Sequence, residues 1–287
     1  MDVVYLCRAG ENEELRWSMR SLKNLPHDKV WIFGGKPPAW VTGVEHVDVS
    51  QEGQKAAVTT RAMRAACNHD GVSDPFIVMN DDFFIVKPQA GCPVWHQGTI
   101  EETIERFESE DERNRGSEYM SEMRQTLDIL EQMGFVDPLS YELHTPLVIH
   151  KETMLEALDL VEASGMRGAH KRSVYGAFAF EGGTQILDGK LARPQDPIRP
   201  DAPCLSSLDQ YFQEVRPVLR YLLGDDMSEY ESYVPEVVVK TSPLTDPICI
   251  GRDVLFGGKR YPAGCAIPLA LARQMYQAGF LKDARLA

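Results

Sequence analysis

The chain has 287 residues, of which 43% are hydrophobic and 25% charged, which suits one large domain with a small annex. Its formal net charge of −13 repels polyanions and excludes tight nonspecific binding of nucleic acid, although it leaves room for a local basic cleft. No apolar stretch approaches the ~20 residues of a membrane span, and the start lacks the basic segment of a signal peptide, so we expect a cytoplasmic protein.

The first third of the chain alternates strand and helix patterns. Strands are predicted at residues 2–7, 30–33, 44–49 and 76–79, and helices at residues 11–22 and 54–67. Such alternation with short glycine and proline turns is typical of a mainly parallel sheet with helices on both faces. The sequence therefore predicts an α/β fold.

The rest of the chain is predicted to be largely helical. Helices are expected at residues 99–107, 117–133, 151–163 and 207–223, the first two forming an insertion at residues 99–135. Residues 182–203, with closely spaced prolines, predict a loop. Two turns and a helix at residues 268–279 predict a small hairpin-plus-helix unit at residues 245–287, after a main domain of residues 1–240.

Asn80-Asp81-Asp82 follows directly after the apolar strand at residues 76–79. Open α/β sheets bind ligands outside the carboxyl ends of their strands. Two adjacent carboxylates repel each other, so a fold that keeps both ionised usually supplies a cation. A metal site is one interpretation. A simple turn or helix cap, where Asn and Asp are favoured, is the other.

Basic residues near the first helix are candidates for anion binding. Arg8 and Gly10 lie between the first strand and first helix, where a turn and a helix N-terminus can hold a phosphate or nucleotide, although the Rossmann and P-loop glycine spacings are absent. Arg16 and Arg20 share one helical face, and pairing with acidic neighbours such as Glu13 is the alternative for each.

Other candidates lie farther along the chain. His144, in a His-Thr-Pro segment, is a candidate general base, metal ligand or phosphate donor. The basic pair Lys171-Arg172 could neutralise an anionic leaving group or lie in solvent. Asp209, after Ser206-Ser207, equally suits helix capping. A local basic groove could be lined by Lys55, Arg61 and Arg64.

Several segments together resemble successive blocks of the Stealth family. They are residues 2–5, 12–22, 29–40 and 76–84, then His144-Thr145-Pro146, Arg172-Ser173, and residues 205–209 and 228–231. Stealth proteins are sugar-phosphate transferases that use nucleotide-sugar donors on a GT-A-like fold. The compact version of these blocks is also similar to glycosyltransferases of actinobacterial bacteriophages, which would place a phage-encoded chain in the host cytoplasm.

The resemblance implies a GT-A-like core and a metal-diphosphate centre. Asp81 and Asp82 would bind Mg²⁺ or Mn²⁺, with Asp82 as the chief ligand because Asn80 and Asp82 occupy the outer positions of an Asp-any-Asp pattern. His144, Arg172 and Asp209 would converge there as catalytic residues, together with Asp81. The residues expected to bind the nucleotide-sugar donor are Arg8, Gly10, Arg16, Arg20, Lys55, Arg61 and Asn80.

One departure from the family bears on the reaction. Where Stealth proteins follow the first strand with an acidic Val-Asp-Gly turn, this chain has Arg8-Ala9-Gly10, which favours plain glycosyl transfer over phosphotransfer. We therefore expect a metal-dependent glycosyltransferase whose acceptor is a glycan or a modified base of phage DNA. The alternatives are hexose-1-phosphate transfer and a noncatalytic phage or virion binding protein, and the sequence carries no signal for oligomeric state.

Overall fold

The computed structural model describes most of the chain up to residue 232 and short pieces after it. The described residues are 1–110, 115–166, 168, 170–180, 182–191, 196, 199, 202–232, 248–249, 254–256, 259–261, 266–267, 271–272 and 275. None of the helices in these ranges is long and apolar enough to cross a membrane.

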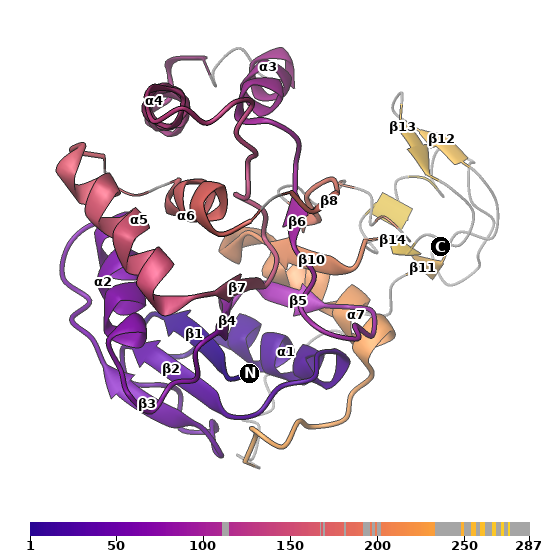
Figure 1. Cartoon of the computed structure of the whole chain (residues 1–287). Coiled ribbons are helices and arrows are strands. Elements are labelled where there is room, and N and C mark those ends of the chain that lie inside the picture. The colour runs from indigo at the N-terminus through magenta and orange to yellow at the C-terminus, as the bar shows by residue number, and fades with distance from the viewer. Residues whose placement is uncertain are drawn as a thin grey trace.

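A five-stranded sheet in the order β3-β2-β1-β4-β7 lies at the centre of the main domain (Figure 1). Its strands are β1 (Val3–Cys7), β2 (Val30–Gly34), β3 (Glu45–Asp48), β4 (Phe76–Met79) and β7 (Leu147–Ile149). The first four run parallel, and β7 pairs antiparallel with β4. The predicted α/β class with a mainly parallel sheet is confirmed, as are the four strands expected in the first third.

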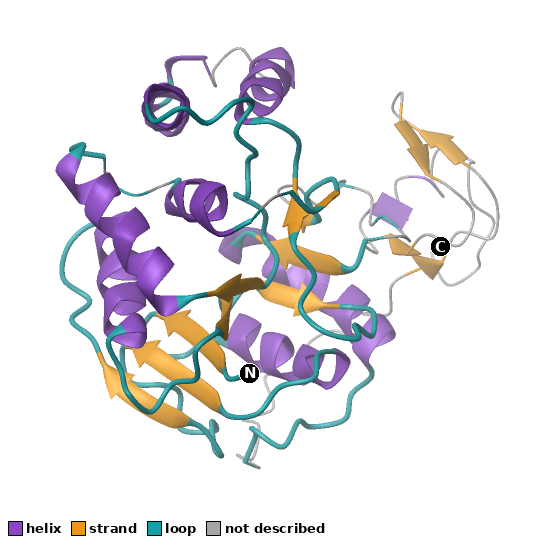
Figure 2. Cartoon of the chain, viewed as in Figure 1, coloured by secondary structure: helices purple, strands orange, loops and turns teal. Residues whose placement is uncertain are grey.

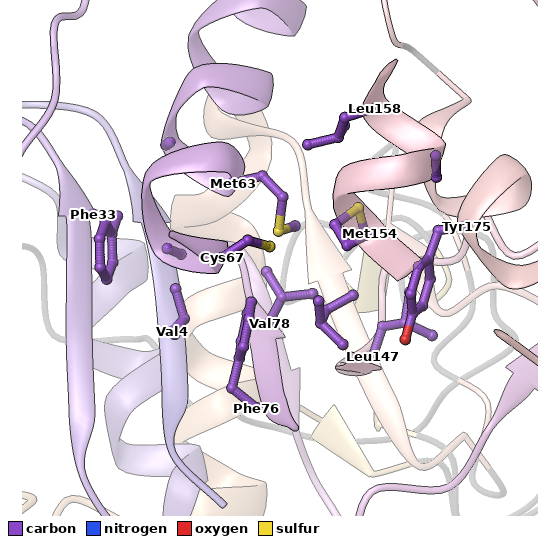
Figure 3. Close-up of a cluster of buried hydrophobic side chains, with 14 of the residues drawn as sticks. Val4, Phe33, Met63, Cys67, Phe76, Val78, Leu147, Met154, Leu158 and Tyr175 are labelled. Atoms are coloured by element: carbon purple, nitrogen blue, oxygen red, sulfur yellow. The ribbon is translucent and has the colours of Figure 1, made fainter. Parts of the chain in front are cut away.

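Three helices cover one face of this sheet: α2 (Lys55–Cys67), α5 (Lys151–Ala163) and α6 (Lys171–Ala179). Their apolar side chains pack against those of the strands in a buried cluster (Figure 3). The labelled members of the cluster are Val4, Phe33, Met63, Cys67, Phe76, Val78, Leu147, Met154, Leu158 and Tyr175.

Helix α6 was not predicted from the sequence. It is a short helix that begins with the Lys171-Arg172 pair and has Gly176 in its interior, which weakens its apolar pattern. A Cβ atom on Gly176 would lie 2.1 Å from the ring of Tyr141, so glycine is needed for this close approach. Gly176 therefore weakens the helical pattern of the sequence but is required for packing against Tyr141.

Helix α1 (Glu13–Ser21) lies on the opposite face of the sheet (Figure 1 and Figure 2). Its residues Leu15 and Met19 pack against Tyr5 and its neighbours. Alternate residues of a strand point to opposite faces, which is why one sheet has two separate cores. The helix begins at the N-cap Asn12, whose side chain accepts a hydrogen bond from the amide of Leu15 at 3.0 Å. The cap fixes Asn12 at the carboxyl edge of the sheet.

A second, three-stranded sheet begins where the first one ends. After β4 the chain turns at residues 80–82 into β5 (Phe83–Ile85). This strand pairs antiparallel with β10 (Cys204–Ser207), which pairs parallel with β9 (Lys190–Leu191). The loop predicted at residues 182–203 was wrong at β9, because a two-residue strand carries too little periodicity to be recognised.

Helix α7 (Phe212–Leu223) follows β10 after a 3-10 turn at Asp209–Tyr211. The prediction that this helix begins at residue 207, with Ser206 and Ser207 as its cap, was wrong. Both serines belong to β10, where Ser206 pairs with Phe83 of β5 and Ser207 pairs with Leu191 of β9.

The predicted insertion consists of α3 (Ile100–Glu110) and α4 (Glu118–Gln132), which lie together away from the five-stranded sheet (Figure 1). They pack on each other through a small apolar cluster that includes Ile100 and Met123. Near their base, β6 (Trp95–His96) pairs parallel with β8 (Thr184–Gln185). Both helices expected in this insertion are thus confirmed.

The C-terminal part is described only in pieces. Strand β11 (Ile248–Cys249) pairs antiparallel with β14 (Ala266–Ile267), and β12 (Val254–Phe256) pairs antiparallel with β13 (Lys259–Tyr261). The second pair agrees with the expected hairpin. Most of the helix predicted at residues 268–279 lies outside the described residues, and the domain boundaries near residue 240 stay a prediction.

The buried cluster shown in Figure 3 predicts different effects for valine-to-alanine substitutions inside and outside it. Val4 is 0% exposed in the cluster, whereas Val136 is 85% exposed. Val4→Ala should lower the free energy of unfolding by about 2 kcal/mol through lost burial and a small cavity, and Val136→Ala should change it by less than about 0.5 kcal/mol. Urea unfolding of both variants checks this. Equal effects would contradict the assigned core.

Candidate functional site

The turn between β4 and β5 places two carboxylates at the carboxyl edge of the parallel sheet. The amide of Phe83 closes the turn by donating to the carbonyl of Asn80 at 3.3 Å. The side-chain amide of Asn12 donates to Asp81 Oδ2 at 2.5 Å, and the hydroxyl of Ser206 donates to Asp82 Oδ2 at 3.1 Å. Each carboxylate is therefore held by a neutral donor from a different element.

These carboxylates lie in an acidic surrounding. Burial raises the pKa of Asp81, and the charge of Asp82 raises it further, against the opposing effects of Asn12, Arg8 and Lys55. Asn80 lies beside them and lines the adjoining cleft. The excess of negative charge at this turn favours a bound cation.

Glu14, in the first turn of α1, belongs to the same group. Burial raises its pKa to about 7, and the charges of Asp209, Asp81 and Asp82 add to that rise while a hydrogen bond from Ser207 opposes it. The Ser207 hydroxyl donates to Glu14 Oε1 at 2.8 Å. At neutral pH, Glu14 therefore exchanges a proton readily, a property suited to acid-base chemistry.

Arg8 and Asp209 meet at the rim of this site although they are far apart in the chain. The guanidinium of Arg8 donates to Asp209 Oδ2 at 2.5 Å and lies 3.9 Å from Glu14 Oε2. Burial raises the pKa of Asp209, but the hydrogen bond and charge of Arg8 outweigh it, so the pKa falls below its ordinary value. Gly10, in the same loop as Arg8, is exposed and has a positive φ of 97°.

A cleft of about 1050 Å³ opens next to the turn. Among the described residues it is lined by six cationic side chains and four carboxylates, in a chain whose net charge is −13. The cationic residues are Lys55, Arg106, Lys171, Arg172, Lys190 and Arg199. The cleft is a local basic site in an acidic molecule, as the sequence analysis allowed.

Arg172 lies in this cleft and holds the segment that carries His144. Its guanidinium donates to the carbonyls of Leu143 at 2.7 Å and Thr145 at 2.6 Å, and it lies 5.7 Å from the ring of Phe83. Its Nε atom is buried without a hydrogen-bond partner. The two terminal nitrogens each carry a second N–H, so the guanidinium keeps donor capacity for an anionic ligand.

His144 has both ring nitrogens engaged. Nδ1 lies 2.6 Å from Asp188 Oδ2, and Nε2 lies 2.7 Å from the ammonium of Lys190. Since a carboxylate only accepts and an ammonium only donates, Nδ1 carries the proton and Nε2 accepts. The expected role of His144 as a general base does not fit this arrangement, because no ring nitrogen is free to take a proton.

Arg16 and Arg20 lie elsewhere. Both guanidinium groups reach Glu231, with Arg20 forming two hydrogen bonds at 2.8 and 2.9 Å and Arg16 lying 3.8 Å away. Arg20 also stacks on Trp17, and Arg16 on Trp40. The shared helical face was predicted correctly, but it binds a distant acid of this chain rather than Glu13, which pairs with Arg216.

The three basic residues of α2 do not form one groove. Lys55 lines the cleft and lowers the pKa of Asp81, as expected of a residue near the site. Arg61 is exposed and donates to the backbone carbonyl of Glu52, while Arg64 pairs with two acids of α5, Asp159 and Glu162. The groove predicted for DNA is therefore wrong in its Arg61 and Arg64 members.

Sequence reasoning missed three residues of this site: Glu14, Asp188 and Lys190. Glu14 follows Glu13 in a first helical turn, a position typical of exposed acids, yet it is only 4% exposed. Asp188 and Lys190 belong to the segment that was predicted as a loop. A basic pair at residues 171–172 was noticed, but its burial against Thr59 is a tertiary feature.

Comparison with known proteins gives a coarse likeness only. No protein-family model matches the chain, and no curated protein matches it significantly. A crystal structure of the galactosyltransferase LgtC with donor and acceptor sugar analogues aligns at 12% identity and a TM-score of 0.37, covering 82% of this chain and 88% of that one.

Two further glycosyltransferases align with a similar score. GlyE of Streptococcus pneumoniae has 11% identity and a TM-score of 0.32 over 74% of this chain and 45% of GlyE, and mouse xyloside xylosyltransferase 1 has 8% identity and a TM-score of 0.32 over 80% and 96%. TM-scores this low carry no weight for function, which is inferred below from the site's own residues. The Stealth-like identity stays a hypothesis.

The raised pKa of Glu14 predicts a pH-dependent stability difference. Ionising Glu14 in the folded state is costly, so the wild type should lose stability relative to Glu14→Gln as pH rises from its ordinary pKa of 4.5 to about 7. The change in the stability difference should be roughly 3 kcal/mol. Urea unfolding of both proteins from about pH 5 to pH 8 checks this. A difference that is constant over that range would contradict the assignment.

The position of Arg20 predicts a structural role for it. Its side chain is 11% exposed and that of Glu231 is 1% exposed. Arg20→Met should leave this buried carboxylate with only Ser228 and the more distant Arg16 as partners, and should cost roughly 3 kcal/mol of unfolding free energy. Arg220→Met, which breaks the exposed pair with Asp225, is the control and should cost less than about 1 kcal/mol. A weakened affinity for pyrophosphate in Arg20→Met would instead support the predicted donor-binding role.

Proposed function

We propose that this chain is a metal-dependent glycosyltransferase that moves a sugar from a nucleotide-diphosphate donor to an acceptor hydroxyl. The observation that carries the proposal is the cleft lined by cations beside Asp81 and Asp82, at the carboxyl edge of the parallel sheet. Ligands of open α/β sheets bind at this edge. The cations suit a diphosphate, and the carboxylates suit a divalent metal ion.

The cationic side chains that line the cleft favour an anionic ligand. Burial lowers the pKa of Lys171, of Arg172 and of Lys190, which means that these charges are held in a partly desolvated place. Buried cations are costly unless an anion or polar partners compensate them. A diphosphate would supply oxygen acceptors to several of these groups at once.

The carboxylate pair fits a divalent cation in the chemistry of its oxygen atoms. Asp81 and Asp82 each have Oδ2 engaged by one hydrogen bond, and an ionised carboxylate has further lone pairs. No group of three His, Cys, Asp or Glu residues suited to a metal is found among the described residues. Mg²⁺ or Mn²⁺ would therefore be held by these two acids together with donor phosphates, and when bound would neutralise charge on the departing diphosphate.

Among the remaining residues, the cations would bind the diphosphate and a carboxylate would accept the proton of the acceptor. Arg172 and Lys171 would bind the diphosphate, while Lys55 would approach it from α2. Asp209 has a lowered pKa and is a weak base, whereas Glu14, with a pKa of about 7, would accept a proton more readily. In the inverting case, Glu14 is therefore the better base for the acceptor hydroxyl, either directly or through Asp209.

The helical insertion bears on the acceptor. Arg106, Phe107 and Tyr119 bring α3 and α4 to the cleft, and these helices carry many acids, of which Glu110 lines the cleft. The acidic residues are Glu101, Glu102, Glu105, Glu108, Glu110, Glu118, Glu122, Asp128 and Glu131. The excess of negative charge on these two helices repels a polyanion, so a glycan is favoured over a modified base of duplex DNA.

Replacement of Asp82 tests the proposal. With Mn²⁺ present, calorimetry against uridine and guanosine diphosphosugars should give binding to the wild type. Slow hydrolysis of the preferred donor, with water as the acceptor of the sugar, should release nucleoside diphosphate. Asp82→Asn should reduce turnover by at least ~100-fold while its melting curve stays near that of the wild type. The control is Asp225→Asn, a surface acid paired with Arg220. An active Asp82→Asn variant would contradict the metal-ligand role.

The same screen separates the alternatives. Mass spectrometry of the product would show whether phosphate moves with the sugar, as in the hexose-1-phosphate transfer of Stealth proteins. Release of nucleoside monophosphate instead of diphosphate would indicate that reaction. No heat with any donor would favour the noncatalytic binding protein.

A further inference from the structure

His144 is held by several contacts, although its side chain is 28% exposed. Its backbone amide donates to Asp188 Oδ1 at 3.3 Å, and its Nδ1 donates to Asp188 Oδ2. One carboxylate therefore binds both the backbone and the side chain of His144. The ring of Phe83 packs against the imidazole edge-on, with 5.9 Å between centroids. Arg172 holds the carbonyls on either side of His144. The position and tilt of the imidazole are therefore fixed.

This setting determines what Nε2 presents to the cleft. A carboxylate that accepts from Nδ1 fixes the neutral tautomer with an unprotonated Nε2. That atom accepts from the ammonium of Lys190 at 2.7 Å. A protonated imidazole would place two positive donors against each other, so the contact needs the tautomer that Asp188 selects.

Lys190 is placed to meet a ligand at the metal-binding turn. It lines the cleft and belongs to β9, which pairs with the strand that carries Ser206. Burial lowers its pKa, while the nearby charges of Asp82 and Asp188 oppose that effect. Its ammonium has three donors, of which the imidazole takes one, leaving capacity for an anion.

We propose that Asp188 and His144 are positioning residues that hold the ammonium of Lys190 toward the diphosphate of the donor, which makes Lys190 a diphosphate-binding residue. This proposal rests on the proposed function. It adds that a lysine, held in place by a histidine, contacts the diphosphate. The histidine itself is not assigned a role in proton transfer. The comparable charge at Lys171 is held differently, by Thr59 and a backbone carbonyl.

The test measures pyrophosphate affinity by calorimetry in the presence of Mg²⁺. Lys190→Met should bind at least about tenfold more weakly than the wild type, because one charge-assisted hydrogen bond is lost. Asp188→Asn should also bind several-fold more weakly, since the amide can donate to Nδ1 and favour the other tautomer. The double variant should be no weaker than Lys190→Met, as expected for residues that act through one another. Lys87→Met, outside the cleft lining, is the control and should bind like the wild type.

A second readout separates positioning from loss of folding. Nitrogen-15 NMR of histidine-labelled protein, with His144 assigned by its absence in His144→Gln, should show protonated Nδ1 and unprotonated Nε2 in the wild type. The pattern should reverse or average in Asp188→Asn while its melting temperature stays near that of the wild type.

The outcomes distinguish this inference from the proposed function. If the wild type binds pyrophosphate and Asp188→Asn or Lys190→Met binds it equally well, the positioning role is wrong and the proposed function stands. An unchanged tautomer in Asp188→Asn also overturns it. If the wild type does not bind pyrophosphate, both the proposed function and this inference are wrong.

Discussion

The turn at residues 80–82 is the constraint on which the rest of the site depends. There the chain leaves the five-stranded sheet and enters the three-stranded one, so its side chains must lie at the edge shared by both. Buried Ser18 holds the turn by donating to the carbonyl of Phe83 at 2.6 Å, and the hydroxyl of Tyr5 lies 3.0 Å from Ser18 Oγ. A hydroxyl pair inside the core of the protein thus fixes a charged turn at its surface.

Around this turn the protein separates two kinds of charge. The acids Glu14, Asp81, Asp82 and Asp209 gather at the ends of α1, β4 and β10, where each raises or lowers the pKa of its neighbours. The cations gather in the adjoining cleft, on α2, α6 and β9. Since opposite charges are held close together but not all paired, a ligand that combines a metal ion with phosphate oxygens would satisfy both groups.

The hydrogen bonds of His144 explain why it is unsuited to act as a general base. Sequence alone presents it as a lone histidine in a loop, and only the fold shows that its two nitrogens are already committed. Acid-base chemistry would then fall to a carboxyl group, and Glu14 is the one whose environment brings its pKa to about 7. In the proposed mechanism, positioning and proton transfer would therefore fall to different residues.

Local patterns in the sequence predicted much of the fold. Helix α5 was expected at residues 151–163 and lies at Lys151–Ala163, because its apolar stripe is long and regular. The acids after β4 were placed at the sheet edge for the same reason, since the strand pattern and the turn are adjacent in the chain. Short strands such as β9 gave no comparable signal.

Contacts between distant residues could not be predicted. Arg20 and Glu231 are 211 positions apart, and Arg8 and Asp209 are 201 apart, so neither pairing follows from spacing. The role of Ser206 in holding Asp82 depends on β10 pairing with β5, which a helix-capping pattern concealed. Candidate residue types were therefore visible in the sequence, whereas their partners came from the tertiary fold.

A crystal structure with Mn²⁺ and a nucleoside diphosphate would test the central claim most directly. We expect an anomalous manganese peak within coordination distance of Asp82, with the diphosphate in the cleft between the metal ion and Lys190. Manganese and diphosphate bound away from the turn at residues 80–82 would contradict it, as would a diphosphate bound at Arg16 and Arg20.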